Sequence, residues 1–292
     1  MLLHRYPELP LTFDSRLGTP LNPTIITSAI TGSVPRKEHN PAIPVSISEQ
    51  IESTQESFEA GSSLVHIHVR DKDESPSSDP EKFAVVQEGI RKFCPGIIIQ
   101  FSPGGRGRDP ADRASALHLR PDMASLATGT VNFPSIIYTN SPELIRDLAR
   151  QMLELDIKPE IEVFDLSMLY IALEMAEEEE LKTPLHVQFV MGIKNAMPAR
   201  REALAFMVEE LGRLAPDATW VAAGIGKNQR VVNTWCAELG GHMRTGLEDN
   251  VRYDRENLAK NNAQLVELAA EICSEHDSRP ATTKEARSIL GL

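Results

Sequence analysis

Two histidines separated by one residue, His66 and His68, stand in the segment 65–70, whose other residues up to Arg70 are apolar. Alternate side chains of a β-strand point to the same face, so both imidazoles are predicted to project together from a buried strand. Buried polar rings need partners, and one metal ion supplies a partner for both. Catalytic zinc sites commonly take three protein ligands and leave one position open. The pair therefore predicts a metal site with a third ligand elsewhere, and two hydrogen-bonded core histidines are the alternative.

The segment 244–250 is the second candidate for chemistry, because it holds Arg244, Glu248 and Asp249 within six residues. Adjacent carboxylates in one loop cannot both aim at the same point. One of them is expected to complete a His-His-Glu metal site, as in known catalytic zinc centres. The other is free to pair with Arg244 or to act on a substrate proton. A solvated acidic turn is the alternative for this segment taken alone.

Two glycine-containing segments could bind anions. Backbone N–H groups and nearby cations suit phosphate or carboxylate, although such glycines are also ordinary turn residues. The first segment follows the third predicted strand and contains Ser102, Gly104, Gly105, Arg106 and Arg108. The second follows the seventh predicted strand, where barrels often bind phosphate, and contains Gly224, Gly226, Lys227 and Arg230.

Short apolar, β-branched runs alternate with amphipathic stretches along the whole chain. The runs predict strands at 24–31, 64–70, 97–101, 123–127, 160–164, 186–190, 219–224 and 242–246. Helices are expected to begin near Ser48, Asp79 and Ser141, and a last long helix is expected over 255–275. Such alternation implies parallel strands with right-handed crossovers.

Eight strands fit a closed (β/α)8 TIM barrel of the α/β class better than an open doubly wound sheet. No Gly-x-Gly-x-x-Gly pattern follows the first predicted strand, as a doubly wound dinucleotide fold would require. We therefore expect one catalytic domain over 24–292, preceded by an N-terminal arm over 1–23. The arm is expected to cap the base of the barrel or to contact a neighbouring subunit.

The predicted barrel assigns each polar residue to the carboxyl end or the amino end of its strands. Active sites of such barrels lie at the carboxyl ends of the strands. Strand ends or the loops just beyond them are predicted for His66, His68, Ser102, Ser125, Glu162, Arg244, Glu248 and Asp249. His186 opens its strand instead, so we expect it to be structural.

Composition excludes several classes of function. The 292 residues carry a net charge of −12, which argues against a nucleic-acid binder. No apolar run approaches the roughly 20 residues of a membrane span, and the start lacks a signal-peptide pattern. The three cysteines are scattered and are expected to be reduced thiols. These features predict a cytoplasmic protein.

With these residues in place, the sequence resembles the β-keto acid cleavage enzymes from about residue 24 onward. The resemblance rests on motifs in the same order, at 28–32, 66–70, 99–102, 123–126, 221–226 and 240–250. It implies a zinc-dependent (β/α)8 enzyme that condenses a β-keto acid with acetyl-CoA, releasing acetoacetate and a new CoA thioester. It also implies a homo-oligomer, a tetramer or a dimer.

The resemblance assigns roles to individual residues. His66, His68 and Glu248 match the zinc ligands of the family. Arg244 and Asp249 match its catalytic pair. Two serines, Ser102 and Ser125, match its substrate site. The phosphates of CoA would need basic residues at the rim of the site, and the candidates are Arg106, Arg108, Lys227 and Arg230.

One position departs from the family member that acts on an amino-keto acid. That enzyme has a glutamate two residues past the Ile-Thr-Gly turn, where this chain has Val34. An isopropyl group would leave a substrate ammonium unpaired. The sequence therefore predicts a β-keto acid without that amine, of uncharged or apolar character.

Three other functions compete with this interpretation. A hydrolase of the amidohydrolase type places its His-x-His on the first strand, whereas here it is on the second. A divalent-metal aldolase or lyase would act on a keto acid without CoA, so saturation by acetyl-CoA separates it. A metal-braced scaffold without activity predicts four closed ligands.

Overall fold

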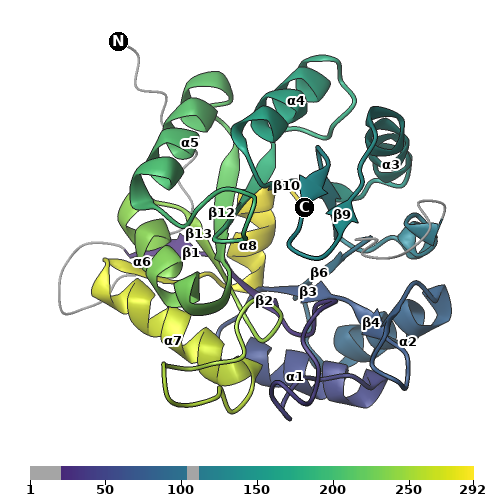
Figure 1. Cartoon of the computed structure of the whole chain (residues 1–292), viewed down its shortest axis with the longest axis vertical. Coiled ribbons are helices and arrows are strands. Elements are labelled where there is room, and N and C mark those ends of the chain that lie inside the picture. The colour runs from purple at the N-terminus through teal and green to yellow at the C-terminus, as the bar shows by residue number, and fades with distance from the viewer. Residues whose placement is uncertain (1–20, 104–111) are drawn as a thin grey trace.

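Eight parallel strands close into a barrel in the computed structural model, which describes residues 21–103 and 112–292. Each strand neighbours the next one along the chain, and the last closes against the first (Figure 1). They are β2 (Ile26–Ala29), β3 (Leu64–Ile67), β6 (Ile98–Phe101), β7 (Met123–Ala127), β10 (Lys158–Val163), β11 (His186–Met191), β12 (Thr219–Gly224) and β13 (His242–Thr245). All eight predicted strands and the (β/α)8 barrel are confirmed.

Helices lie around the outside of the barrel (Figure 1). They are α1 (Ile47–Glu59), α2 (Pro80–Phe93), α3 (Pro142–Glu154), α4 (Leu166–Glu177), α5 (Arg201–Leu214), α6 (Gln229–Leu239) and α7 (Asn262–Glu275). The predicted caps Asp79 and Ser141 both accept backbone N–H groups, and each precedes a proline at the first helical position. The first helix begins two residues earlier than expected, because Ser46 and Glu49 form a capping box.

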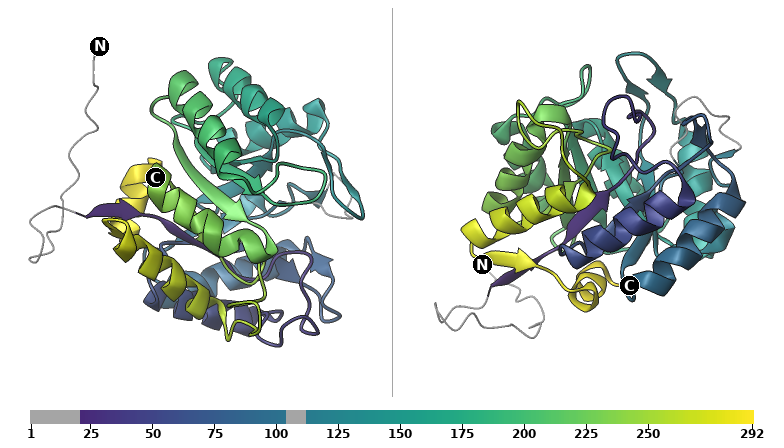
Figure 2. Two further views of the ribbon diagram at one scale, coloured as in Figure 1. Left: turned by 60° about the vertical axis from the view of Figure 1, so that its left-hand side comes forward. Right: turned by 90° about the horizontal axis from the view of Figure 1, so that it is seen from below.

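The amino end of the barrel is closed by elements from both ends of the described chain. Strand β1 (Asn22–Thr24) pairs in parallel with β14 (Ser278–Pro280) outside the barrel (Figure 2). Helix α8 (Thr283–Leu290), which the sequence analysis did not predict, packs Ala286 and Leu290 against the first residues of the barrel strands. Residues 1–20 lie outside the described chain, so the role of the arm remains a prediction.

The last long helix is shorter than predicted. It begins at Asn262 rather than at residue 255, and the Asn261 side chain accepts the N–H of Gln264. The preceding residues form a loop in which Arg252 and Leu258 make an isolated antiparallel bridge. The charged side chains of this segment are solvated whether the backbone is a loop or a helix, so the charge pattern gave no sign of where the helix begins.

Two short hairpins stand above the carboxyl ends of the strands. One pairs β4 (Val69–Arg70) with β5 (Pro76–Ser77), and the other pairs β8 (Val131–Asn132) with β9 (Ile137–Tyr138). The first hairpin divides the predicted strand 64–70, so the barrel strand ends at Ile67 and His68 lies just beyond it. None of the helices in the described ranges is long and apolar enough to cross a membrane.

The barrel interior holds a polar layer near the amino ends of the strands. His186 is buried at the start of β11, with its Nε2 3.3 Å from Oε2 of Glu160 and its Nδ1 2.8 Å from Oγ1 of Thr219. These three residues are register partners on neighbouring strands. Their position agrees with a structural role for His186.

Candidate metal centre and active site

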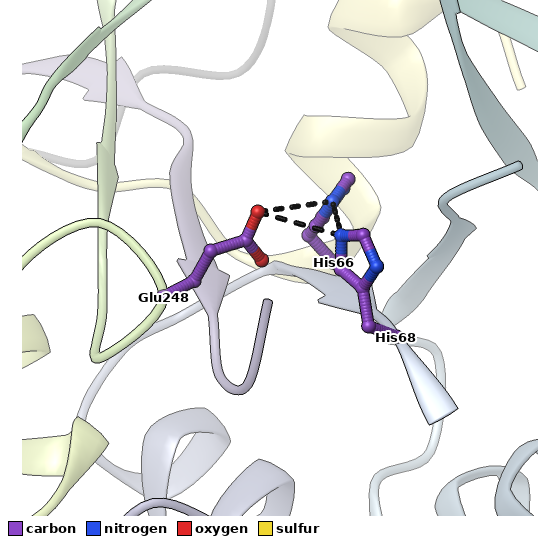
Figure 3. Close-up of side chains that lie close together, drawn as sticks. All are labelled: His66, His68 and Glu248. Atoms are coloured by element: carbon purple, nitrogen blue, oxygen red, sulfur yellow. Dashed lines mark hydrogen bonds and ion pairs between the residues drawn. The ribbon is translucent and has the colours of Figure 1, made fainter. Parts of the chain in front are cut away.

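His66, His68 and Glu248 converge at the carboxyl end of the barrel (Figure 3). The two Nε2 atoms are 3.2 Å apart, and they lie 3.7 and 3.4 Å from Oε1 of Glu248. Ligand distances near 2.0–2.1 Å give the edges of a tetrahedral zinc site a length of about 3.3 Å. The described residues contain no other group of three such side chains with this spacing. The three ligand atoms therefore have the spacing of a tetrahedral metal site.

His66 is held in the form that a metal requires. Its Nδ1 donates to Oε1 of Gln100, the register partner on β6, and this leaves the Nε2 lone pair facing His68. Burial lowers the pKa of His66 to about 4, which outweighs the raising effect of the Glu248 charge. The ring is therefore neutral near pH 7 and oriented by a hydrogen-bond partner on its other nitrogen, as ligating histidines usually are.

Arg244 joins the two carboxylates of the following loop. From β13, its Nη2 donates to Oε1 of Glu248 at 2.8 Å, and its Nε and Nη2 reach the two oxygens of Asp249 at 2.8 and 3.0 Å. Burial raises the pKa of Glu248, but the charges of Arg244 and the two imidazoles outweigh it and hold that pKa well below its ordinary value. For Asp249 burial prevails over the lowering by Arg244, and its pKa is raised. The loop thus carries an anionic ligand beside a carboxylate more basic than an ordinary aspartate.

The turn after β2 packs so closely on Glu248 that position 32 has room only for glycine. The N–H of Glu248 donates to the carbonyl of Ala29 at the end of β2. Gly32, two residues beyond Ile30, has a φ of +66°, and a Cβ at this position would lie 2.5 Å from Cγ of Glu248. The turn after β2 therefore packs directly on the third ligand and fixes its position.

We expect Gly32→Ala to weaken metal binding about 10- to 100-fold, as changes that disturb the orientation of a ligand usually do. The added methyl group must displace Glu248, and the positive φ adds about 1–2 kcal/mol of backbone strain. Gly240→Ala is the matched control, because Gly240 has a φ of +77° but no atom within 4 Å of the added Cβ. Competition with a chelator measures the affinity, and equal affinities in the two variants would contradict the prediction.

A cavity of about 650 Å³ opens beside the ligand cluster at the mouth of the barrel. Half of the predicted site residues line it: Val34, His68, Ser102, Gly226, Lys227, Arg244, Glu248 and Asp249. Ser125 is buried on β7 and does not line the cavity, but its Oγ lies 3.5 Å from Oγ of Ser102. The structure therefore places His68, Glu248, the Arg244–Asp249 pair and Ser102 at one cavity, and the buried His66 reaches it only through its neighbour His68.

Other predicted anion-binding residues have different surroundings. Gly224 does not line the cavity, and it is needed because a Cβ would lie 2.5 Å from the carbonyl oxygen of Asn228. The N–H of Gly226 donates to the carbonyl of Asp249 at 2.7 Å, so it is not free for a phosphate. Arg230 is exposed on α6, away from the cavity lining. Four residues predicted to bind substrate or CoA fall outside the described chain: Gly104, Gly105, Arg106 and Arg108.

Glu162 is a further titratable group of the cavity. The sequence placed it at the mouth but gave it no role. Burial raises its pKa to about 7, with the charges of Glu160 and Glu248 adding to the rise and Arg244 opposing it. The alternation of Glu160, Ile161 and Glu162 on one strand could have shown that both glutamates face the barrel interior.

Glu162→Gln is expected to stabilise the metal-free protein at pH 8. The folded-state pKa of about 7 lies above the ordinary 4.5, so the folded state holds the extra proton between these pH values. Above pH 7 the buried charge opposes folding by at most about 3 kcal/mol, and the amide removes this cost. We expect a gain of about 1–3 kcal/mol in the free energy of unfolding at pH 8 and none near pH 4.5.

Urea unfolding at the two pH values, in the presence of a chelator, measures this difference. Glu275→Gln serves as the control, because Glu275 is exposed at the end of α7 and is expected to give no pH-dependent gain. A gain for Glu162→Gln that is equal at both pH values would contradict the raised pKa.

Fold and site together define an α/β-barrel protein in which three side chains with metal-ligand spacing lie beside an Arg244–Asp249 ion pair at the mouth of the barrel. The sequence profile of the β-keto acid cleavage enzymes matches residues 23–292. The chain belongs to this family.

Individual relatives support the same grouping. The chain is 58% identical over 270 residues to the 3-oxoadipate:acetyl-CoA acetyltransferase of Cupriavidus necator, covering 92% of this chain and 95% of that one. It is 39% identical over 270 residues to the 3-keto-5-aminohexanoate cleavage enzyme of Fusobacterium nucleatum, covering 92% and 97%. Its fold matches the ternary complex of ObcA with a C4-CoA adduct and oxalate, with a TM-score of 0.78, 19% identity, and coverage of 86% and 68%.

Proposed function

We propose that this protein transfers an acyl group from a β-keto acid to CoA, using acetyl-CoA as co-substrate and a zinc ion held by His66, His68 and Glu248. The observation that carries the proposal is the cluster of these three side chains, of which His68 and Glu248 share one cavity with the Arg244–Asp249 pair. The names of the relatives supply the reaction class, since one is an acetyl-CoA acetyltransferase of a keto acid and another a keto acid cleavage enzyme.

The three side chains suit a divalent ion of zinc type. They offer two imidazole nitrogens and one carboxylate oxygen, a donor set found in catalytic zinc sites that leave one position open. The second oxygen of Glu248, Oε2, is buried and has no hydrogen-bond partner among the described residues. A buried polar atom without a partner is costly, and a cation beside it would satisfy it. When bound, the ion would act as a Lewis acid toward the oxygens of a keto acid.

Asp249 is the base of the proposed reaction. Its carboxylate removes a proton from the carbon between the keto and carboxyl groups, and Arg244 holds the carboxylate toward the cavity. The resulting carbanion attacks the thioester carbon of acetyl-CoA and forms a new carbon–carbon bond. CoA then passes as the thiolate to the original keto carbon, and the bond between that carbon and its former neighbour breaks. Asp249 returns its proton to the carbanion that this cleavage releases, so the products are acetoacetate and the CoA thioester of the remaining acyl chain.

Ser102 is placed to orient the substrate. It is 5% exposed, lines the cavity beside His68, and lies within reach of the Ser125 hydroxyl. A hydroxyl at this position can donate to a substrate carboxylate or to an oxygen that becomes negative during the reaction. Ser125 would act through Ser102, because it does not reach the cavity itself.

We propose 3-oxoadipate, a six-carbon dicarboxylate, as the substrate. The 58% identical relative is named for this keto acid. Val34 lines the cavity with 51% of its surface exposed and offers no carboxylate to a substrate amine. The proposal keeps the expected lack of an amine, but it replaces the expected uncharged chain with one that ends in a second carboxylate.

A panel of β-keto acids assayed with acetyl-CoA tests the function. We expect 3-oxoadipate to give the highest kcat/KM for acetoacetate release, followed by an uncharged six-carbon β-keto acid, and then by 5-amino-3-oxohexanoate. Preference for the amine-bearing substrate would contradict the proposal. Cleavage of the keto acid without acetyl-CoA would favour the aldolase alternative instead. The homo-oligomer and the cytoplasmic location stay predictions of the sequence.

A further inference from the structure

Basic side chains other than Arg244 line the cavity from the loops of four consecutive strands. Lys194 and Lys227 lie on the loops that follow β11 and β12. Arg252 lies on the loop that follows β13, and His39 on the loop that follows β2. Because β13 and β2 are neighbours in the closed barrel, the two loops that carry Arg252 and His39 adjoin and form one wall of the cavity.

Hydrogen bonds fix this wall next to the metal ligands. The amide of Asn40 donates to the carbonyls of Val251 and Ala259 at 2.9 and 2.8 Å, and so joins the loop after β2 to the loop after β13. The latter loop also carries Glu248 and Asp249, and the former contains Gly32 in contact with Glu248. Val34, which belongs to the same loop as His39, lines the same cavity as His39 and Arg252.

Hydrogen bonds hold the backbone at Arg252, and its guanidinium makes no direct contact with a carboxylate of the described residues. Its N–H donates to Oδ1 of Asn250, and its carbonyl accepts from Nδ2 of the same asparagine. Asp254, an acidic residue of the same loop, accepts hydrogen bonds from the backbone N–H groups of Glu256 and Asn257 and from the Asn257 side chain. These hydrogen bonds, with the more distant charge of Arg252, lower the pKa of Asp254. The guanidinium of Arg252 lines the cavity and can bind an anionic ligand there.

His39 offers a hydrogen-bond donor on the same wall. Its Nδ1 accepts the N–H of Arg36 at 2.9 Å, so the neutral ring carries its proton on Nε2. The Nε2 lies 3.9 Å from Oε1 of Glu38, whose side chain is 79% exposed. That carboxylate is therefore a distant neighbour in solvent, and an anion in the cavity can compete for the donor.

We infer that Arg252, assisted by His39, binds the second carboxylate of a dicarboxylic β-keto acid, while Lys194 and Lys227 face the phosphates of CoA. The inference rests on the proposed function. The keto acid end of the substrate is held at the metal ligands, so its far end lies over the adjoining wall. Lys227 follows β12, the seventh barrel strand, and barrels often bind phosphate at the loops after the seventh and eighth strands. Lys194 lies on the neighbouring loop after β11.

Replacement of Arg252 should affect one substrate selectively. A guanidinium binds a carboxylate through two parallel hydrogen bonds, which neither glutamine nor lysine reproduces. A hydrogen bond to a charged group contributes about 1.5–3 kcal/mol, which corresponds to about 10- to 150-fold in KM. We expect Arg252→Gln to raise KM for 3-oxoadipate by that factor and Arg252→Lys to raise it less. The KM for acetyl-CoA and the kcat/KM for an uncharged six-carbon β-keto acid should change less than about threefold.

Three further variants complete the experiment. Arg255→Gln removes an exposed arginine of the same loop that does not line the cavity, and it should leave all constants unchanged. Lys227→Gln should raise KM for acetyl-CoA but not for either keto acid. His39→Gln should raise KM for 3-oxoadipate about threefold to tenfold, the effect of one lost hydrogen bond.

The outcomes separate this inference from the proposed function. If the wild-type protein releases no acetoacetate from any β-keto acid with acetyl-CoA, the proposed function fails. If it does so but Arg252→Gln affects both keto acids equally, the assignment of the second carboxylate is wrong. If Arg252→Gln raises KM for acetyl-CoA alone, Arg252 binds CoA, and the inference is overturned while the function stands.

Discussion

Replacing Asp249 by asparagine is expected to lower kcat about 10²- to 10⁴-fold, the range of a lost general base. Asparagine has nearly the same shape, and its amide oxygen can still accept from Arg244, but it cannot take a proton from the substrate. The KM for the keto acid and the metal content should stay within about threefold, because Glu248 keeps its own contact with Arg244. Steady-state kinetics with metal analysis of the same sample measures all three quantities.

Asp254→Asn is the control for this prediction. Asp254 is an exposed carboxylate of the following loop, where it accepts hydrogen bonds from two backbone N–H groups. Its replacement should leave kcat within about twofold. If Asp249→Asn retains a third or more of the wild-type kcat, Asp249 is not the base, and Glu162, with its pKa raised to about 7, becomes the next candidate.

His68→Ala is expected to abolish activity through loss of the metal. Disturbing the partners of a ligand usually costs 10- to 100-fold in affinity, so removal of a ligand should cost at least about 100-fold. His68 is 6% exposed at the edge of the cavity, and its truncation removes less core packing than truncation of the deeper His66 would. Elemental analysis after dialysis should show the wild-type protein with one zinc ion per chain and the variant with little.

His186→Gln is the matched control, since it changes a buried histidine at the opposite end of the barrel. This variant should keep its zinc and at least half of its activity at a temperature where it stays folded. Full activity of metal-free His68→Ala would contradict the catalytic role of the ion and would favour the interpretation of the metal as a structural brace.

The barrel was predictable because its strands are short, apolar and separated by clear helix caps. The run 123–127 became β7, and 219–224 became β12, with the predicted bounds. The metal triad was predictable for a topological reason. The closed barrel leaves only β2 between β3, which carries His66, and β13, which precedes Glu248, so residues far apart in the sequence meet at the mouth.

The remaining features depend on loop conformation, which periodicity does not determine. Nothing in the glycine pattern showed that the Gly226 amide would bond to Asp249 rather than face a ligand. The charge state of Glu162 depends on burial by neighbouring elements. Helix α8 was missed although Thr282 and Glu285 form its capping box, because the helix spans only eight residues and its apolar face is short.

The pairing of β1 with β14 sets a condition on the order of folding. Asn22 pairs with Ser278, and α8 covers Ile25, Leu64 and Met123 at the starts of three barrel strands. A chain emerging from the ribosome exposes these apolar strand starts until β14 and α8 have also emerged. Loop closure between such distant segments is entropically slow. A chain stopped at residue 276 would therefore present an open, apolar barrel base during synthesis and would be prone to aggregate before it could close.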